Sequence, residues 1–150
     1  MLGYSISLYS FDPLLESNDI SKRAAIRFAR SVGCQGFEML DMYWTEGPPR
    51  QKQADALRSD AATESMAISC YTVHNDLAVF EEVPWRKLVD RLLADADLAA
   101  QLGVGVMRVE SAQQPKPPYD VRTFEECLVP VAKGLKMVAR RAAEMGIKVG

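Results

Sequence analysis

The sequence predicts an α/β fold, in which β-strands and α-helices alternate along the chain. Apolar and β-branched runs typical of strands begin near residues 3, 36, 67, 105 and 147. A strand therefore recurs about every 30 to 40 residues, which is the length that a strand, a helix and two connections require. The segments between these runs carry apolar residues at helical spacing. Strands that alternate with helices in this way pair in parallel, with the helices outside the sheet.

The first strand is predicted over residues 2–11 and the first helix over residues 19–32. Asn18 or Asp19 is the expected N-cap of this helix, because both side chains can accept a hydrogen bond from the first turn. The connection between the two elements is expected to be a loop. The helices are also expected to end at glycine, which adopts the left-handed conformation of a C-terminal turn without strain. Such glycines precede three of the strands: Gly33, Gly103 and Gly146.

The middle of the chain repeats this pattern. A strand and its loop are predicted over residues 36–44, a polar helix over 50–65 and a strand over 66–74. A longer helix follows over residues 84–102, and it begins with a proline near the first helical position, where the missing N–H costs nothing. The fourth strand is expected within residues 104–111.

The last helix is marked by its first turn. Thr123 and Glu126 have the spacing of a capping box, in which each side chain binds a backbone N–H of the other residue. Pro130 removes one helical hydrogen bond, so we expect it to kink the helix or to delay its regular part. The fifth strand begins at residue 147.

Composition and charge limit the classes of function. The 150 residues are 48% hydrophobic and 25% charged, which suits one globular domain, and the net charge is −2. This charge argues against a nucleic-acid or membrane partner, and the N-terminus has no leader pattern, so a cytoplasmic location is expected. Three cysteines without a C-x-x-C pair argue against a disulfide framework and a zinc knuckle: Cys34, Cys70 and Cys127.

The number of βα units predicts a barrel that is only partly present. A closed parallel (β/α)8 barrel, the TIM barrel, has eight units and roughly 250 residues, whereas this chain holds four units and the start of strand five. We therefore expect residues 1–150 to be the N-terminal half of a longer barrel. The alternative is a complete open sheet of the flavodoxin type, which also has five strands. That fold normally has a glycine- or serine-rich phosphate loop after strand one, and residues 9–19 contain no glycine.

Four segments resemble one family. They are AIRFARSVGCQGFEML, AISCYTVH, ADLAAQLGVGVMRV and VARRAAEMGIKVG. They resemble the xylose-isomerase-like TIM barrels, the sugar phosphate isomerase and epimerase superfamily, over nearly the whole chain. The resemblance implies a single barrel domain of which residues 1–150 are the N-terminal half. It also implies a divalent metal, Mn, Mg, Co or Zn, held by carboxylates and a histidine at the ends of strands five to eight. The given residues would then hold no metal and be inactive alone.

The ends of the predicted strands carry the candidate site residues, because active sites of barrels lie at the C-terminal strand ends. Glu38 is a charge within an apolar strand, so it faces either the barrel mouth or solvent. His74 is the only histidine and follows the third strand. A lone histidine is often structural, but the resemblance implies one that touches or orients the sugar. Asp41 reads as a loop acid or a helix-capping residue.

Glu110 ends the fourth strand. It is expected to bind a substrate hydroxyl or to pair with Arg108 or Arg122, and the sequence favours neither. The proline-rich segment over residues 113–120 would be a wall or lid of the site, or only a spacer.

Aromatic residues follow the first two strands. Tyr9 and Trp44, with Phe11 and Tyr43, would form apolar walls against one face of a sugar, or would pack within their loops. Trp85 is expected to anchor its helix by packing against the sheet.

Three functions compete. The first is a sugar isomerase, epimerase or dehydratase, which acts on a ketose, aldose or polyol, with or without a phosphate, by metal-assisted proton transfer. In this scheme Glu38 and His74 hold hydroxyl groups. The second is a metal nuclease similar to the apurinic endonucleases, which the acidic charge and the absence of a histidine after strand four disfavour.

The third is a complete, non-enzymatic half-barrel. Four βα units leave two unpaired sheet edges and an inner face that is expected to be apolar, so such a protein would have to close as a homo-oligomer.

Overall fold

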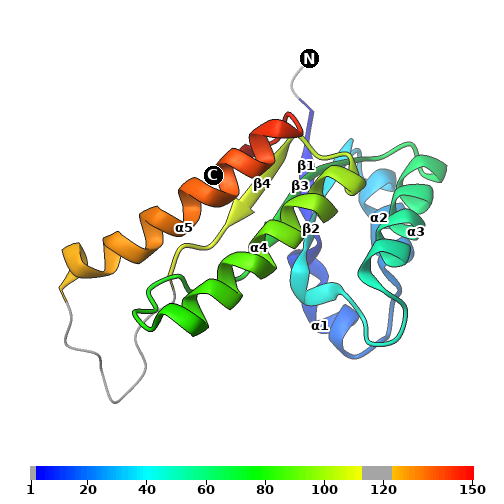
Figure 1. The fold of residues 1–150 in the computed structure, drawn as a ribbon. Helices are drawn as coiled ribbons and strands as arrows, with labels where there is room; N and C mark the ends of the chain where they lie inside the picture. Colours follow the sequence, from blue (N-terminus) through cyan, green and yellow to red (C-terminus); the bar gives the residue numbers. More distant parts are fainter. Residues whose placement is uncertain (1–2, 113–122) are drawn as a thin grey trace.

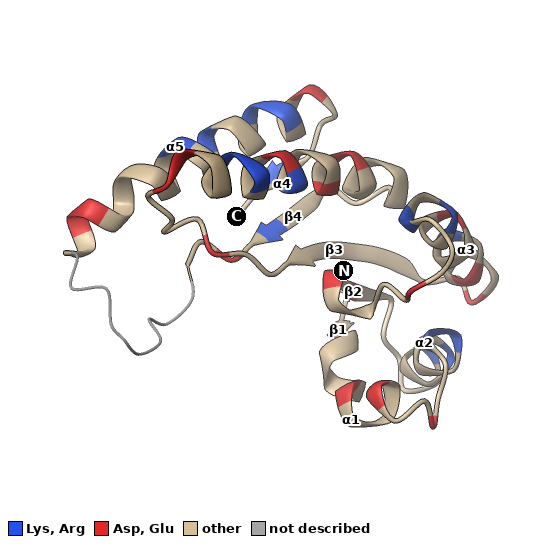
Figure 2. Cartoon of the chain, turned by 60° about the horizontal axis from the view of Figure 1, so that its bottom comes forward, with Lys and Arg blue, Asp and Glu red and all other residues tan. Residues whose placement is uncertain are grey.

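The computed structural model describes residues 3–112 and 123–150, which form one parallel β-sheet covered by helices on one side. Figure 1 shows the sheet with helices α2 to α5 ranged around it, and Figure 2 shows that these helices follow its convex face. Strands neighbouring in sequence are neighbours in the sheet, in the order β1-β2-β3-β4-β5, and each pair is parallel. The predicted α/β fold of parallel βα units is therefore confirmed.

The strands are short and the last two helices are long. The strands are β1 (Ser5–Ser7), β2 (Gly36–Leu40), β3 (Ala67–Val73), β4 (Val106–Val109) and β5 (Lys148–Val149). Two 3-10 helices follow the first two strands, η1 (Leu8–Phe11) and η2 (Asp41–Tyr43). The α-helices are α1 (Asp12–Glu16), α2 (Lys22–Ser31), α3 (Arg50–Thr63), α4 (Glu82–Leu102) and α5 (Phe124–Glu144).

The first βα connection differs from the prediction. The strand stops at Ser7, whose side chain accepts a hydrogen bond from the backbone N–H of Tyr9 and so starts η1. The end of the predicted strand, residues 8–11, therefore forms η1, and the segment expected to be a loop contains α1. The predicted N-cap of α2 was also wrong, because Ser21 caps this helix by accepting from the N–H of Ala24. Asn18 has a left-handed φ of 58°, so it belongs to the turn before the helix.

The helix ends otherwise follow the prediction. Gly33, Gly103 and Gly146 have φ values of 95°, 75° and 74°, the left-handed region that favours glycine. The capping box of Thr123 and Glu126 is present at the start of α5. These turns let each helix return directly to the next strand.

Pro130 lies inside a continuous helix, so it does not delay the start of α5. The indole N–H of the buried Trp85 donates a hydrogen bond to the Pro130 carbonyl at 3.1 Å. Lys133, one turn along α5, lies 4.3 Å from the centre of the Trp85 ring. Trp85 is therefore a packing anchor as expected, but these contacts join α4 to α5 rather than to the sheet.

The hydrophobic core lies between the sheet and the helices. Phe37 and Met39 of β2, Tyr71 and Val73 of β3 and Met107 of β4 all point to this side, where their side chains are fully or almost fully buried. Side chains alternate between the two faces of a strand. The intervening residues therefore lie on the inner, concave face.

The inner face is more polar than the sequence suggested. The Ser5 and Ser69 hydroxyls are 2.6 Å apart across Gly36, where a Cβ atom would lie only 3.4 Å from the Ser5 oxygen. Glu38 and Arg108 follow on the same face, nearer the strand ends. The expectation of an apolar inner face was wrong for these positions, because serine and charged residues occupy them.

The expectations about the cysteines and about membrane-spanning segments can also be compared with the structure. All three cysteines are free and half-buried. Among the helices of the described ranges, none combines the length and the apolar character needed to cross a membrane.

Candidate functional site

A cavity of about 400 Å³ lies at the C-terminal ends of β1 to β4, on the concave side. This volume is in the range of ordinary ligand pockets. Parallel pairing brings all the strand ends to this edge, so residues far apart in sequence meet here. The cavity is lined by Ser7, Tyr9, Ser10, Glu38, Leu40, His74, Arg108 and Glu110. Four of the predicted site residues therefore share one pocket: Tyr9, Glu38, His74 and Glu110.

Glu38 is a fixed carboxylate at the floor of this cavity. The buried hydroxyl of Thr72 donates a hydrogen bond to Glu38 Oε1 at 2.5 Å, and Arg108 Nε lies 3.6 Å from the same oxygen. Arg108 Nε also donates to the Thr72 hydroxyl at 3.1 Å. These contacts orient the carboxylate towards the barrel mouth rather than outward to bulk solvent.

His74 is held by Asp41 from behind. Asp41 Oδ1 lies 2.6 Å from His74 Nδ1 and accepts the backbone N–H of the same residue at 3.1 Å. An ionised Asp41 requires the hydrogen on Nδ1, so the neutral ring presents the Nε2 lone pair. Nε2 faces Glu110, whose Oε1 lies 3.8 Å away. The Nε2 atom of His74 is therefore the ring nitrogen that faces the cavity.

Asp41 is the functional residue that the sequence interpretation missed. The sequence predicts a loop acid or a helix-capping residue at this position, whereas in the structure Asp41 orients His74. The signal that could have found it is its position directly after β2, beside the end of β3, where the only histidine lies. Neighbouring parallel strands bring such positions together.

The alternatives left open for Glu110 are partly resolved. Arg108 pairs with Glu38, and Glu110 faces His74. Arg122 and the proline-rich segment over 113–120 lie outside the described residues.

Two of the four aromatic residues proposed as walls, Tyr9 and Trp44, lie in different places. Tyr9 is 58% exposed and lines the cavity with Glu38. Trp44 donates its indole N–H to the Tyr71 hydroxyl at 2.8 Å and lines a second cavity on the other side of His74. Only Tyr9 is positioned to contact a ligand beside Glu38.

Phe11 and Tyr43 contact neighbouring helices, α2 and α1, rather than residues of their own loops. The Phe11 ring meets Phe28 edge to face, with the ring centres 6.0 Å apart. The Tyr43 hydroxyl donates to Asp12 at 2.6 Å. Both side chains therefore stabilise the first two βα connections.

The described residues do not fit a metal centre. Within residues 3–112 and 123–150, no group of three or more His, Cys, Asp and Glu side chains could hold a metal ion. His74 already uses Nδ1 towards Asp41, which leaves one ring nitrogen. The arrangement can bind hydroxyl groups and accept or donate a proton at Nε2 and at the carboxylates.

Comparison with solved structures finds the same fold in longer proteins. A D-psicose 3-epimerase from Clostridium cellulolyticum H10 superimposes with a TM-score of 0.78 at 11% identity, over 99% of this chain and 51% of that one. A sugar phosphate isomerase/epimerase from Parabacteroides distasonis ATCC 8503 gives 0.69 at 15% identity, over 100% and 51%. A probable 3-DHS dehydratase from Bacillus anthracis gives 0.66 at 17%, over 99% and 51%.

The chain thus spans about half the length of the solved structures that it matches. At these identities the likeness shows the fold. No curated protein sequence matches significantly. A family model for xylose isomerase-like TIM barrels matches residues 26–150, which is most of the chain. This protein therefore belongs to the xylose isomerase-like TIM-barrel family.

Proposed function

We propose that this chain forms the substrate-binding half of a sugar isomerase or epimerase, which acts on a ketose, aldose or polyol. The observation that carries the proposal is the joint position of Glu38, His74 and Glu110 in one cavity at the strand ends. The family and the epimerase and isomerase neighbours support the same class of reaction.

Sugar recognition needs several fixed acceptors for hydroxyl groups. Glu38 Oε1 is held by Thr72, which leaves the other carboxylate oxygen for a substrate hydroxyl. The 3.8 Å between His74 Nε2 and Glu110 Oε1 is longer than a hydrogen bond. A hydroxyl group in this region can donate to one of them while the other holds a neighbouring hydroxyl.

In this proposal, His74 and Glu110 also take part in proton transfer. Isomerisation and epimerisation move a proton at a carbon next to a carbonyl group. With Asp41 behind it, His74 can take a proton at Nε2, because the carboxylate stabilises the imidazolium that forms. Glu110 then faces the new charge.

The divalent metal expected for the complete barrel remains part of the proposal. The described residues do not supply its ligands, so these would come from elsewhere in the whole protein. A metal there would polarise the carbonyl and hydroxyl oxygens. The chain described here binds and orients the substrate, and catalysis is proposed only for the complete barrel.

The first test uses the single histidine as a reporter. D-fructose, D-tagatose and sorbitol are titrated into the protein while the ring signals of His74 are followed by NMR. We expect a saturable shift with at least one of them. A hydrogen bond to a charged group contributes about 1.5–3 kcal/mol, so Glu38→Gln should weaken binding by about 10- to 100-fold.

Glu64→Gln is the matched control. Glu64 is also partly buried and paired with arginine, but it lies between α2 and α3, away from the cavity. It should leave the affinity within about two-fold, an effect too small to indicate a lost contact. No saturable His74 shift with any of the three compounds, or equal losses in both variants, would contradict the proposal.

A further inference from the structure

A second cavity, of about 550 Å³, lies on the far side of His74. It is formed by the loops after β2 and β3, the start of α3 and the middle of α4. Arg50, Asn75 and Arg91 line it, and His74 is a wall common to both cavities. The lining of this second cavity also includes two carboxylates, Asp41 and Asp76.

Both arginines have donors to spare. Arg50 uses Nη1 towards the buried Asp95 at 3.4 Å. Arg91 uses Nη2, which donates to the His74 carbonyl at 2.5 Å and to Asn75 Oδ1 at 3.0 Å. A guanidinium group carries five N–H donors. The other donors of these two groups have no partner among the described residues.

Asn75 is an unsatisfied donor at the same place. Its side chain is only 3% exposed, and Nδ2 has no hydrogen-bond partner among the described residues. An unpaired buried amide costs about 1–3 kcal/mol. An acceptor atom bound in the cavity would remove this cost.

The start of α3 adds positive potential. The helix begins at Arg50, and its N-cap Pro49 makes no side-chain hydrogen bond to the first turn. The first turn contains no acidic residue. The free N–H groups and the helix dipole at such an end favour an anion.

Two carboxylates also line the cavity and have other partners. Asp41 binds His74, and Asp76 Oδ1 accepts the backbone N–H of Ala78 at 3.0 Å. Their two negative charges equal in number the two positive charges of the arginines, so the pull on an anion comes from the positions of the free N–H groups. One oxygen of each carboxylate has no partner among the described residues, so the unpaired groups of the cavity are these two acceptors and the N–H donors of Arg50, Arg91 and Asn75.

We propose that this second cavity binds an oxyanion, a phosphate ester or a carboxylate, carried by the substrate whose hydroxyl groups occupy the first cavity. His74 separates the two cavities. That one substrate occupies both of them is the part of the inference that rests on the proposed function. Arg50 and Arg91 bind the anion, with the Asn75 amide as a third donor. The substrate is then a sugar acid or a sugar phosphate rather than a neutral sugar.

The test titrates inorganic phosphate and, separately, succinate into the protein. Binding is followed by calorimetry and by the NMR signal of the Asn75 side-chain amide. We expect saturable binding of at least one probe, and the stronger probe identifies the anionic group. Arg50→Gln should weaken it at least ten-fold, the loss expected when a charged hydrogen-bond donor is removed.

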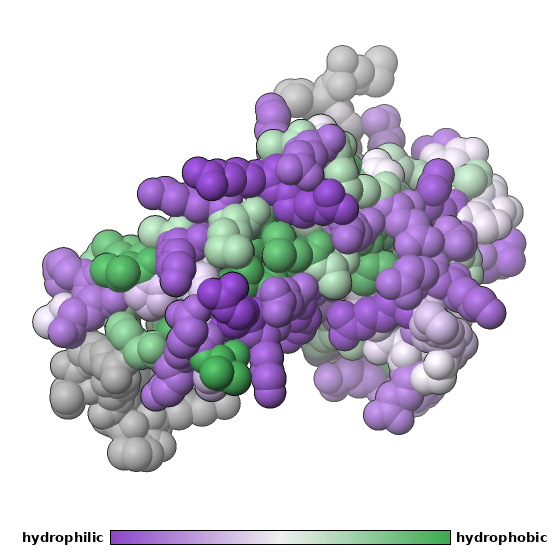
Figure 3. Space-filling view, in the orientation of Figure 1, coloured by the Kyte–Doolittle hydropathy of each residue, from purple (hydrophilic) through white to green (hydrophobic). Residues whose placement is uncertain are grey.

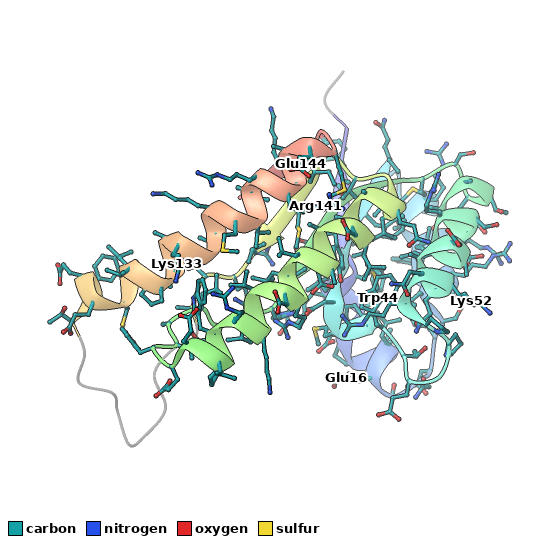
Figure 4. All side chains as sticks on the ribbon, viewed as in Figure 1. Glu16, Trp44, Lys52, Lys133, Arg141 and Glu144 are labelled. Atoms are coloured by element: carbon teal, nitrogen blue, oxygen red, sulfur yellow. The ribbon has the colours of Figure 1, made fainter. Side chains whose placement is uncertain are left out.

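Lys52→Gln is the matched control, since it removes the same charge two residues further along α3. Lys52 lies on the side of α3 away from α5 (Figure 4) and does not line the cavity. Arg50→Lys is the second variant, because it keeps the charge beside Asp95 but removes the planar donor group. It should fold normally and still weaken binding, and phosphate should raise the Tm of the parent protein more than that of either Arg50 variant.

The two proposals can fail separately. Glu38→Gln should leave phosphate binding unchanged, and Arg50→Gln should leave the binding of D-fructose unchanged. Anion binding without any sugar binding would contradict the proposed function alone. Absence of saturable phosphate and succinate binding, or equal losses in Arg50→Gln and Lys52→Gln, would overturn the oxyanion site.

Discussion

Asp41 controls which nitrogen of His74 faces the cavity. One carboxylate oxygen accepts both the ring N–H and the backbone N–H of His74. The side chain and the backbone are therefore fixed by the same atom, and the Arg91 bond to the His74 carbonyl adds a third restraint. A ring restrained in this way loses little entropy when a ligand binds.

Asp95 illustrates the opposite case, a buried carboxyl that is incompletely paired. It is 1% exposed, and the Tyr71 hydroxyl donates to Oδ1 at 2.9 Å while Oδ2 has no partner among the described residues. Burial raises the pKa of Asp95 above its ordinary value of 3.8. The folded state therefore favours the neutral carboxyl. Stability from this preference is fully present below about pH 3.8 and is lost as the pH rises through the folded pKa.

Asp95→Asn is expected to stabilise the protein at pH 7, with an advantage that shrinks as the pH falls to 4. Asparagine is neutral at every pH and still offers an oxygen to the Tyr71 hydroxyl. The free energy of unfolding should be measured by urea denaturation at pH 7, 5.5 and 4. The control is Asp97→Asn on the same helix, whose exposed carboxylate pairs with Arg141. A difference between Asp95→Asn and the parent that is independent of pH would refute this account.

At the scale of elements, α4 and α5 pack closely because a glycine lies between them. Figure 3 shows hydrophobic side chains gathered between these helices, with hydrophilic side chains along their outer surfaces. A Cβ atom on Gly134 of α5 would lie 3.0 Å from both Leu77 methyl carbons and 3.4 Å from Val89 Cγ2. Leu77 is fully buried, so its methyl groups have little room to move.

Gly134→Ala is therefore expected to destabilise the protein by about 1 kcal/mol. The alanine gains up to about 1 kcal/mol of helix propensity, but overpacking costs about 1–3 kcal/mol. Thermal and urea denaturation measure the net change. In the background of Leu77→Ala, which removes the crowded methyl groups, the same substitution should become neutral or stabilising. If the cost persists in that background, the contact with Leu77 is not its cause.

Helices, strands and turns could be predicted where the residues that determine them are close together in the sequence. The five strands, the glycine turns and the capping box of Thr123 depend on neighbours in sequence, and the structure has them. The sequence interpretation missed the short helix α1. It also missed the cap at Ser21, because Asn18 and Asp19 have equally good capping side chains. Only the backbone turn at Asn18 shows that Asn18 lies before the helix and does not cap it.

The candidate site was predictable only in part, for a related reason. Glu38, His74 and Glu110 end strands, and parallel strands must bring their ends together. The Asp41 contact depends on a short 3-10 helix after β2, and the second cavity depends on the placing of α3 against α4. The second cavity has no local sequence signal, and the Asp41 contact has only the position of Asp41 directly after β2.

On the scale of the whole molecule, the sheet formed by residues 3–112 and 123–150 has two open edges. Within these ranges β1 pairs only with β2, and β5 pairs only with β4, through two residues. β2 and β3 are paired on both sides and pack against helices. The stability of the backbone hydrogen bonds should therefore fall from the middle of the sheet to its edges.

Amide hydrogen exchange measures this gradient strand by strand. We expect the amides of β2 and β3 to exchange only through global unfolding, because both their ladders must break first. Amides of β1 and β5 should exchange on the order of 100-fold faster, since edge strands open locally. The control is a dilution series, because an edge covered by a second copy of the chain gains protection as the concentration rises. Edge amides as slow as those of β3 at every concentration would contradict the gradient and would mean that both edges are stabilised within the chain itself.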